Sequence, residues 1–526
     1  MNEVSLDDAL RLAPEAVLTE NGIIRATGSL SDVSAMAEKD AKRTDLQGRC
    51  LMPSFIDSHS HILECGRYSL YCYLGQCKNH SEIIDTIKTF ISEHNISSDA
   101  VIGYGYDHNY LEEGTPPDKR ILDQVSTALP IVVFHISGHT ACANSKALAM
   151  AGISDKTENP QGGVIVRLHN TSEPSGYLEE NAMYMLPDIF FKCKESDIPT
   201  IEISMQDHYL KNGITTVQDG ASDINVLNTL KRIADEGKLK VDVVSYQMIA
   251  KGGKDTLRKN PERCRKYKNG LKIGGYKVIL DGSPQARSAW MTKPYVGGKH
   301  DYCGYPWHTD EEVQDFVTTA LREGHQIMVH CNGDAAGDQY LNAYEKALAD
   351  TGAKGDLRPV MVHCQTARND QLDRMAKLGM VATIFVGHVY YWGDIHMRNF
   401  GPERGSRVSP VNDALKRGIT YTLHQDSPVT PPHMMHSVWC AVNRITRGGK
   451  HIGPEEKVGV YDALKGITIN AAYQYFEEHE KGTISPGKRA DLVVLDRSPL
   501  EVRPDDLKDI RVCCTIKDGQ TVYGSE

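Results

Sequence analysis

Two histidines that a single serine separates stand near the start of the chain. In the stretch LMPSFIDSHSHI, residues 51–62, an apolar run leads to an acidic residue and then to His59 and His61. Because successive side chains of a strand point to opposite faces, residues two positions apart share a face and their ring nitrogens converge. Convergent imidazoles suit a metal ion. For an isolated pair, one core histidine and one loop histidine explain the pattern equally well, so the rest of the chain has to decide.

Further candidate ligands stand at the ends of strands that we expect in the second half of the chain. The strand-like runs HQIMVH, RPVMVH, MVATIFVGH and ITYTLHQD end on His330, His363, His388 and Asp426. A single histidine at a strand end is more often structural. Its recurrence on successive strands, together with the first pair, favours one shared metal site.

The segments between those strands predict the helices that bring the strand ends together. HTDEEVQDFVTTALREG, residues 308–324, opens with Thr309 and Glu312 at capping-box spacing and carries an apolar stripe. Similar helices are expected at residues 338–350, 369–379 and 411–418. This alternation predicts an α/β fold with a (β/α)₈ barrel, in which the carboxyl ends of the strands converge on one face.

Composition narrows the class of protein and partner. The 526 residues are 40% hydrophobic and 24% charged, which suits one large domain and a smaller one. A net charge of −10 without a Lys/Arg-rich run argues against nucleic acid and against an anionic membrane as partners. We find no basic-then-apolar leader and no apolar window of membrane length, so we expect a cytoplasmic protein. The 13 cysteines form no C-x-x-C pair, which argues against zinc-finger chemistry.

Both ends of the chain are rich in strand signals. Asn21-Gly22 marks a hairpin turn in EAVLTENGIIRATGS, and Asp518-Gly519 does so in VCCTIKDGQTVY. The run RADLVVLDR predicts one more strand near the C-terminus. We therefore expect residues 1–50 and 482–526 to meet in one small sheet domain, with residues 51–481 as the main body.

The sequence resembles the amidohydrolase superfamily, and within it amidohydrolase family 3, which includes N-substituted formamide deformylases. The resemblance runs nearly end to end and implies a distorted (β/α)₈ TIM barrel, a small β-sandwich built from both termini, and a metal-activated hydroxide that attacks amides or related bonds. The stretches that carry it are PSFIDSHSHI, GHTACANSKAL, GGVI with EPSGYLEENA, GITTVQDG, YKVILDGS, MVHCNGDAAGD, LHQDSPVTPP and KGITINAAYQYFEEHEKGTISPGKRADLVVLD.

The resemblance also implies a ligand set. By it, His59 and His61 hold one metal, His330 and His363 hold the other, and Asp426 touches both metal and bound water. Such ligands suit zinc or another divalent transition metal, with two ions per chain. Asp426 would take a proton from the attacking hydroxide and pass it to the departing nitrogen, first as general base and then as general acid.

Lys277 matches the lysine that many relatives carry as an N-carboxylated bridging ligand. It stands among apolar neighbours in GGYKVILDG. Burial lowers the pKa of a lysine, so that its neutral amine can react with carbon dioxide. The alternative is a Lys277 that faces outward into solvent.

Substrate contacts are expected from four residues. His139 and His388 are candidates for orienting the substrate carbonyl or stabilising its oxyanion, or else for supporting the ligands. Tyr106, in the aromatic stretch GYGYDHNYLEEGTPP, would either wall an apolar pocket or belong to the core of a lid. We also count Arg287 among the candidate substrate-binding residues. An insertion or lid is expected at residues 66–200.

Two other functions remain open at this point. A mononuclear deaminase of a heterocyclic amine has the same fold, but such relatives place a glutamate three residues after the fifth-strand histidine, where this chain has Gly333. A non-catalytic scaffold that binds partners would have lost ligands that this chain retains. We expect a small-molecule substrate and a homo-oligomer, a dimer.

Overall fold

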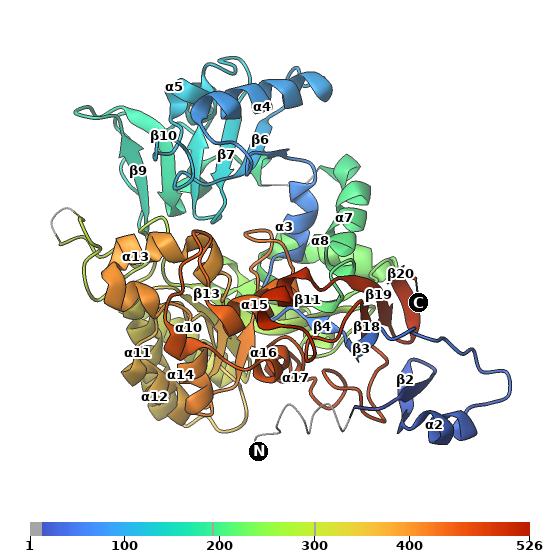
Figure 1. The fold of residues 1–526 in the computed structure, drawn as a ribbon. Coiled ribbons are helices and arrows are strands. Elements are labelled where there is room, and N and C mark those ends of the chain that lie inside the picture. The colour runs from blue at the N-terminus through green and yellow to red at the C-terminus, as the bar shows by residue number, and fades with distance from the viewer. Residues whose placement is uncertain (1–12, 192–193, 299–300, 526) are drawn as a thin grey trace.

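The computed structural model describes residues 13–191, 194–298 and 301–525. Figure 1 shows a central body of strands and helices, a separate lobe above it that carries β6, β7, β9 and β10, and small sheets from the two ends of the chain at one side. Residues 1–12 of the predicted small domain lie outside the described residues.

The central body contains an eight-stranded parallel sheet that curls into a barrel. Each strand pairs in parallel with the next, with a register shift within the pairings of β4 with β11, β11 with β12, and β12 with β13. This confirms the predicted distorted TIM barrel. From one end of the sheet to the other the strands are β4 (Phe55–Ile56), β11 (Ile214–Ser222), β12 (Asp242–Met248), β13 (Leu271–Ile279), β14 (Gln326–Cys331), β15 (Val360–His363), β16 (Val381–Ile384) and β17 (Tyr421–Leu423).

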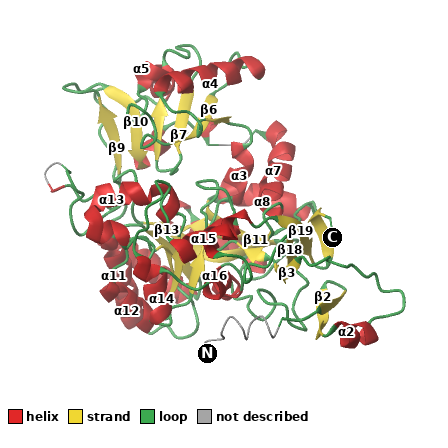
Figure 2. Cartoon of the chain, in the orientation of Figure 1, coloured by secondary structure: helices red, strands yellow, loops and turns green. Residues whose placement is uncertain are grey.

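Helices follow most of these strands and cover the outside of the sheet, as Figure 2 shows. Their bounds are α7 (Ile198–Leu210), α8 (Ile224–Asp235), α9 (Gly253–Lys259), α10 (Asp310–Glu323), α11 (Asp334–Thr351), α12 (Asn369–Lys377), α13 (His388–Ser406), α14 (Val411–Lys416), α15 (Met434–Asn443), α16 (Val460–Gly466) and α17 (Ile469–Gln474). No helix among the described residues combines the length and the apolar character needed to cross a bilayer.

Helix α10 illustrates how local sequence sets these elements. Thr309 and Glu312 form the predicted capping box, and Gly324 ends the helix with a φ of 69°. Val313 and Val317 lie on the buried stripe that packs on the sheet. The predicted helix therefore forms where its caps and its apolar face agree.

The predicted insertion is a folded lobe with a sheet of its own. The sheet order is β5-β6-β7-β8-β10-β9, and two buried apolar clusters lie within the lobe. It is therefore a small domain above the strand ends rather than a loop that closes over them. Its strands are β5 (Cys72–Tyr73), β6 (Val101–Tyr106), β7 (Ile131–His135), β8 (Thr140–Ala143), β9 (Gly163–Arg167) and β10 (Pro174–Glu180), with helices α3 (Ile62–Tyr68), α4 (His80–Glu93), α5 (Lys119–Leu122) and α6 (Ser145–Met150) before or between them.

The two ends of the chain meet in antiparallel sheets. Strand β3 (Cys50–Pro53) pairs with β18 (Leu492–Leu495), which continues to β19 (Val512–Lys517) and β20 (Gln520–Gly524). Strands β1 (Ala16–Glu20) and β2 (Ile23–Gly28) form a hairpin, preceding α2 (Leu30–Met36). Ile24 of the hairpin packs against Ala490 and Leu492, so an apolar cluster joins the two sheets.

Buried ion pairs fasten the C-terminal segment to the bottom of the barrel. Asp242, at the start of β12, lies 2.8 Å from the Nζ atoms of both Lys481 and Lys517. Arg489 contacts the same carboxylate at 3.1 Å. Three cations share this one buried carboxylate, so its loss would leave buried positive charge that is no longer fully balanced, which makes the cluster costly to break.

Candidate metal centre

The carboxyl ends of the barrel strands bring six candidate ligands to one place. Lys277 lies in β13, His330 in β14 and His363 at the end of β15, while the others follow β4 and β17. This is the convergence that parallel strands in a barrel produce. The residues that gather here are His59, His61, Lys277, His330, His363 and Asp426.

The spacing around Asp426 fits a shared cation. Its Oδ1 atom lies 3.5 Å from Nε2 of His59 and 3.4 Å from Nε2 of His61. A direct charge-assisted hydrogen bond would be shorter, about 2.7–2.9 Å. Ligand atoms held at zinc-like distances in a tetrahedron lie about 3.4 Å apart. Oδ1 is buried and accepts no hydrogen bond from any described residue, so the residues present fit a metal ion.

More donors lie on the other side of the same carboxylate. Oδ2 of Asp426 lies 3.9 Å from Nε2 of His363, whose ring centroid is 4.4 Å from that of His330. Nζ of Lys277 lies 3.5 Å from Nε2 of His59. Lys277 is therefore buried and directed toward the ligands, and the outward, solvated alternative does not describe it.

Hydrogen bonds to the far ring nitrogens orient two of the histidines. Nδ1 of His59 lies 2.5 Å from Oε1 of Gln218, and Nδ1 of His330 lies 3.1 Å from Oδ1 of Asp281. A proton on Nδ1 satisfies these oxygens and leaves Nε2 with a lone pair. Such support fixes both the tautomer and the direction of a ligating imidazole.

His424 is a member of the site that we did not predict. Its Nε2 atom lies 3.1 Å from Nδ1 of His363, and it groups with His363 and Asp426 as a set of potential metal ligands. It stands two residues before Asp426 in the run TLHQD. The same two-residue spacing that singles out His59 and His61 would have identified it.

Burial and neighbouring charges set the protonation of the site. Burial lowers the pKa of His59, His330 and His363, which keeps these imidazoles neutral and able to bind metal. Burial lowers the pKa of Lys277 to about 8, against the opposing effect of Asp426. Burial would raise the pKa of Asp426, but the surrounding histidines outweigh it and hold that pKa well below its usual range.

The insertion contributes a paired histidine to the mouth of the barrel. Nδ1 of His139 lies 2.7 Å from Oε2 of Glu180, and its ring centroid lies 5.2 Å from that of His330. Burial would lower the pKa of His139, but the Glu180 carboxylate outweighs it, and the pKa is raised. Glu180 is fully buried, and no local pattern identified it.

His388 does not end a strand, and this corrects our sequence prediction. Strand β16 ends at Ile384, because the apolar run that follows it leaves the sheet as a loop, and His388 begins helix α13. Its Nδ1 atom lies 2.9 Å from Nε2 of His396, and its ring packs against Phe385 and Trp392. His388 is thus supported from its own helix and packs on Phe385, whose ring also contacts His363 and His424.

Tyr106 and Arg287 make their polar contacts elsewhere. Tyr106 is buried in the core of the insertion, with its hydroxyl 3.1 Å from Sγ of Cys142. The guanidinium of Arg287 donates to Oδ1 of Asn399 at 3.1 Å and to the carbonyl of Val296. Tyr106 therefore belongs to the core of the insertion, as the second of the two sequence-based interpretations expected. Neither Tyr106 nor Arg287 is part of the proposed site.

Comparisons with known proteins find similarity over nearly the full length of the chain. A family profile described as Amidohydrolase family matches residues 42–523. N-substituted formamide deformylase of Arthrobacter pascens is 28% identical, over 98% of this chain and 96% of that protein. Protein LONG AFTER FAR-RED 3 of Arabidopsis thaliana is 27% identical, over 98% of this chain and 89% of that protein. An uncharacterized metal-dependent hydrolase from Pyrococcus horikoshii shares the fold, with a TM-score of 0.74 at 24% identity, over 93% of this chain and 94% of that one.

Proposed function

The chain belongs to the amidohydrolase family, and we propose that it is a metal-dependent hydrolase that cleaves an amide-type, non-peptide carbon–nitrogen bond of a small molecule. The observation that carries this proposal is the unpartnered Oδ1 of Asp426 between Nε2 of His59 and Nε2 of His61. The Arthrobacter relative is named as a deformylase of N-substituted formamides, which is a reaction of this class.

The ligand set that we propose has two halves around Asp426. His59 and His61 would hold one ion, and His330 and His363 the other, with zinc or a similar transition metal preferred by imidazole and carboxylate donors. A divalent metal in such a site lowers the pKa of bound water and polarises a substrate carbonyl.

Lys277 is the residue that would join the two halves. Its amine is buried, 3.5 Å from Nε2 of His59, and its pKa of about 8 leaves a fraction of it neutral near pH 7. Reaction of the neutral amine with carbon dioxide forms a carbamate, which replaces an ammonium by an anion with two oxygen donors. An anion at this position offsets the repulsion between two cations, whereas an ammonium adds to it.

Proton transfer falls to Asp426. Its carboxylate is ionised because the neighbouring histidines hold its pKa low, so it is ready to accept a proton from the attacking water. It then returns that proton to the departing nitrogen, as a general base that becomes a general acid. His139, held by Glu180 through Nδ1, keeps Nε2 for a hydrogen bond to the substrate oxygen, where negative charge develops.

A deaminase of this fold needs a glutamate at the position of Gly333, and the structure leaves no room for that side chain. A Cβ atom at Gly333 would lie 1.8 Å from the carbonyl oxygen of Trp290, and the backbone N–H of Gly333 donates to Asp281 at 2.7 Å. A glutamate at this position would require the backbone to move and would disturb the carboxylate that supports His330. The hydrolase is favoured over the deaminase for this reason.

Measurements of metal binding and of turnover distinguish the hydrolase from a non-catalytic scaffold. We would load the purified protein with zinc, manganese or cobalt and assay N-formyl, N-acyl and cyclic amides for release of the amine. Metal-dependent turnover of one class supports the hydrolase. Stable folding without metal and without turnover of any of these amides would favour a scaffold.

A cytoplasmic location and a homodimer stay predictions.

A further inference from the structure

A second group of potential metal ligands lies in the insertion. Asp107, His108 and His135 place donor atoms within 4.8 Å of one another. They stand at the carboxyl ends of two neighbouring parallel strands, since β6 and β7 pair with Tyr106 opposite His135. The ends of adjacent parallel strands thus bring together Asp107, His108 and His135, just as the barrel strands bring together the first site.

The distances in this group match those of the barrel site. Nε2 of His135 lies 3.4 Å from Oδ1 of Asp107, which is long for a charge-assisted hydrogen bond and close to the edge of a tetrahedron around zinc. The rings of His108 and His135 have centroids 5.1 Å apart. Nδ1 of His108 is buried and has no hydrogen-bond partner among the described residues. A buried polar atom without a partner is costly unless something else binds it.

The surrounding contacts direct these donors toward one point. Nδ1 of His135 lies 2.8 Å from Oγ of Ser137 and 3.1 Å from the backbone N–H of the same residue, so Ser137 holds the ring with Nε2 directed at Asp107. Oδ1 of Asp107 accepts from the backbone and side-chain amides of Asn109, and its Oδ2 accepts from Nε1 of Trp392 at 2.8 Å. Outer hydrogen bonds of this kind orient metal ligands in proteins.

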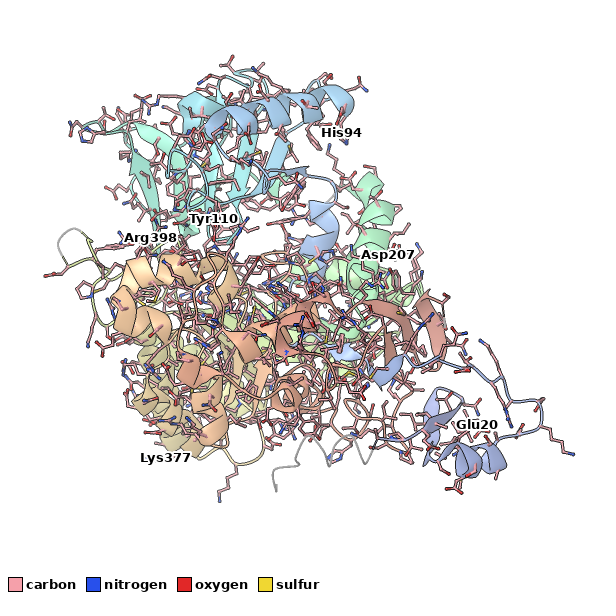
Figure 3. The ribbon with its side chains drawn as sticks, viewed as in Figure 1. Glu20, His94, Tyr110, Asp207, Lys377 and Arg398 are labelled. Carbon is pink, nitrogen blue, oxygen red and sulfur yellow. The ribbon has the colours of Figure 1, made fainter. Side chains whose placement is uncertain are left out.

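We propose that Asp107, His108 and His135 bind one divalent transition-metal ion, of the zinc or cobalt class, separate from the barrel centre. The two imidazoles are borderline donors that select such ions over calcium and magnesium, and zinc also accepts a carboxylate oxygen as a third ligand. Because Asp107 also accepts from Trp392 of helix α13, an ion here stiffens the point where the insertion meets the barrel. Tyr110 lies at the same contact (Figure 3), with its hydroxyl donating to the carbonyl of Tyr391.

Metal content of the full-length protein tests this proposal. Wild-type protein is loaded with zinc, desalted and analysed for metal per chain, beside His108→Ala, Asp107→Asn and the control His169→Ala, which changes an exposed histidine of the same insertion. We expect His108→Ala and Asp107→Asn each to lose one equivalent and the control to lose none. In Asp107→Asn the amide oxygen can take the place of Oδ2 and still accept from Nε1 of Trp392, so a fold that depends on that bond is preserved.

A barrel variant keeps the two sites distinguishable. His59→Ala/His61→Ala should lose metal from the barrel and still retain the equivalent bound by the insertion, seen as the visible absorption of cobalt in a tetrahedral site. Loss of that absorption on adding His108→Ala supports the proposal. Equal metal content in wild-type, His108→Ala and Asp107→Asn proteins would overturn it, and would leave a hydrogen-bonded His135–Asp107 pair as the only role of the group. Metal lost only from the insertion variants would instead contradict the barrel site.

Discussion

Nε2 of His59 lies 3.5 Å from Oδ1 of Asp426, although the two residues follow the strands at opposite ends of the barrel sheet. His59 follows β4 and Asp426 follows β17, so this approach spans the point where the barrel closes. The contact is too long for a charge-assisted hydrogen bond. Gln218 holds the far ring nitrogen of His59, and the backbone carbonyl of Asp426 accepts from the N–H of Val429. A cation held between His59 and Asp426 would join the first strand to the last.

Replacing Asp426 tests its part in proton transfer. In Asp426→Asn the amide cannot accept a proton, so we expect kcat to fall at least ~100-fold while a substrate analogue still binds. Metal content is measured in the same sample, because Asp426 also contacts the proposed ligands. A kcat near that of the wild type with metal retained would remove Asp426 from the mechanism.

Lys277 tests the two-metal arrangement. Lys277→Ala should lose one metal equivalent and most activity, since the bridging anion is gone. Added acetate or propionate should restore part of both by filling the vacated space. Mass analysis under mild conditions provides the direct check, because a carbamate adds the mass of carbon dioxide. An unmodified lysine in fully active, metal-loaded enzyme would favour a mononuclear site built from the histidines and Asp426.

Glu180 tests the contribution of the insertion. Glu180→Gln keeps the size of the side chain but no longer stabilises a charged, oriented His139, so kcat/KM should fall about 10–100-fold. Because the pKa of His139 is raised by Glu180, the pKa that governs the alkaline limb of kcat/KM, where His139 loses its proton, should move to lower pH. Glu179→Gln is the matched control, since Glu179 contacts Tyr305 at 3.3 Å. Equal losses in both variants would indicate a merely structural effect.

Asp242 tests the attachment of the C-terminal segment. Asp242→Asn removes the carboxylate that Lys481 and Lys517 share, leaving Lys481 paired with Glu477 alone, and should lower the free energy of unfolding by about 3–5 kcal/mol. Asp518→Asn is the control, because that carboxylate is 48% exposed and should cost at most about 1 kcal/mol. Denaturant unfolding at pH 7 measures both, and equal effects would contradict the account.

The pH dependence of this cluster has a definite sign. Burial would raise the pKa of Asp242, but Lys481, Lys517 and Arg489 outweigh it and lower the folded-state pKa. A depressed carboxyl pKa contributes stability that is complete above the unfolded pKa of about 4 and is lost as the pH falls toward the folded-state value. The stability difference between the wild type and Asp242→Asn should therefore shrink below pH 4 and stay constant from pH 5 to 7.

Most ligands of the barrel site could be predicted from the sequence because the patterns that identify them are local. His59 and His61 are recognisable by spacing, and His330 and His363 by the apolar runs that end on them. His388 was misplaced because FVG continues the apolar character of strand β16 beyond the point where its pairing ends at Ile384. Apolar character alone does not mark the last residue of a strand.

Other parts of the site depend on contacts that no local pattern records. Glu180 reaches His139 because β10 pairs with β8, and its own neighbours in the sequence give no hint of that pairing. The position of Tyr106 in β6 suits either a pocket wall or a core. Only its contact with Cys142 shows that it belongs to the core. The separate sheet of the insertion is likewise a product of pairing between distant strands.

Anomalous diffraction from crystals of the zinc-loaded protein tests the central claim most directly. The account predicts a peak at the zinc edge about 2.0–2.2 Å from Nε2 of His59, Nε2 of His61 and a carboxylate oxygen of Asp426. Zinc-loaded crystals without a peak between these three residues, from protein that is active in the same buffer, would contradict it.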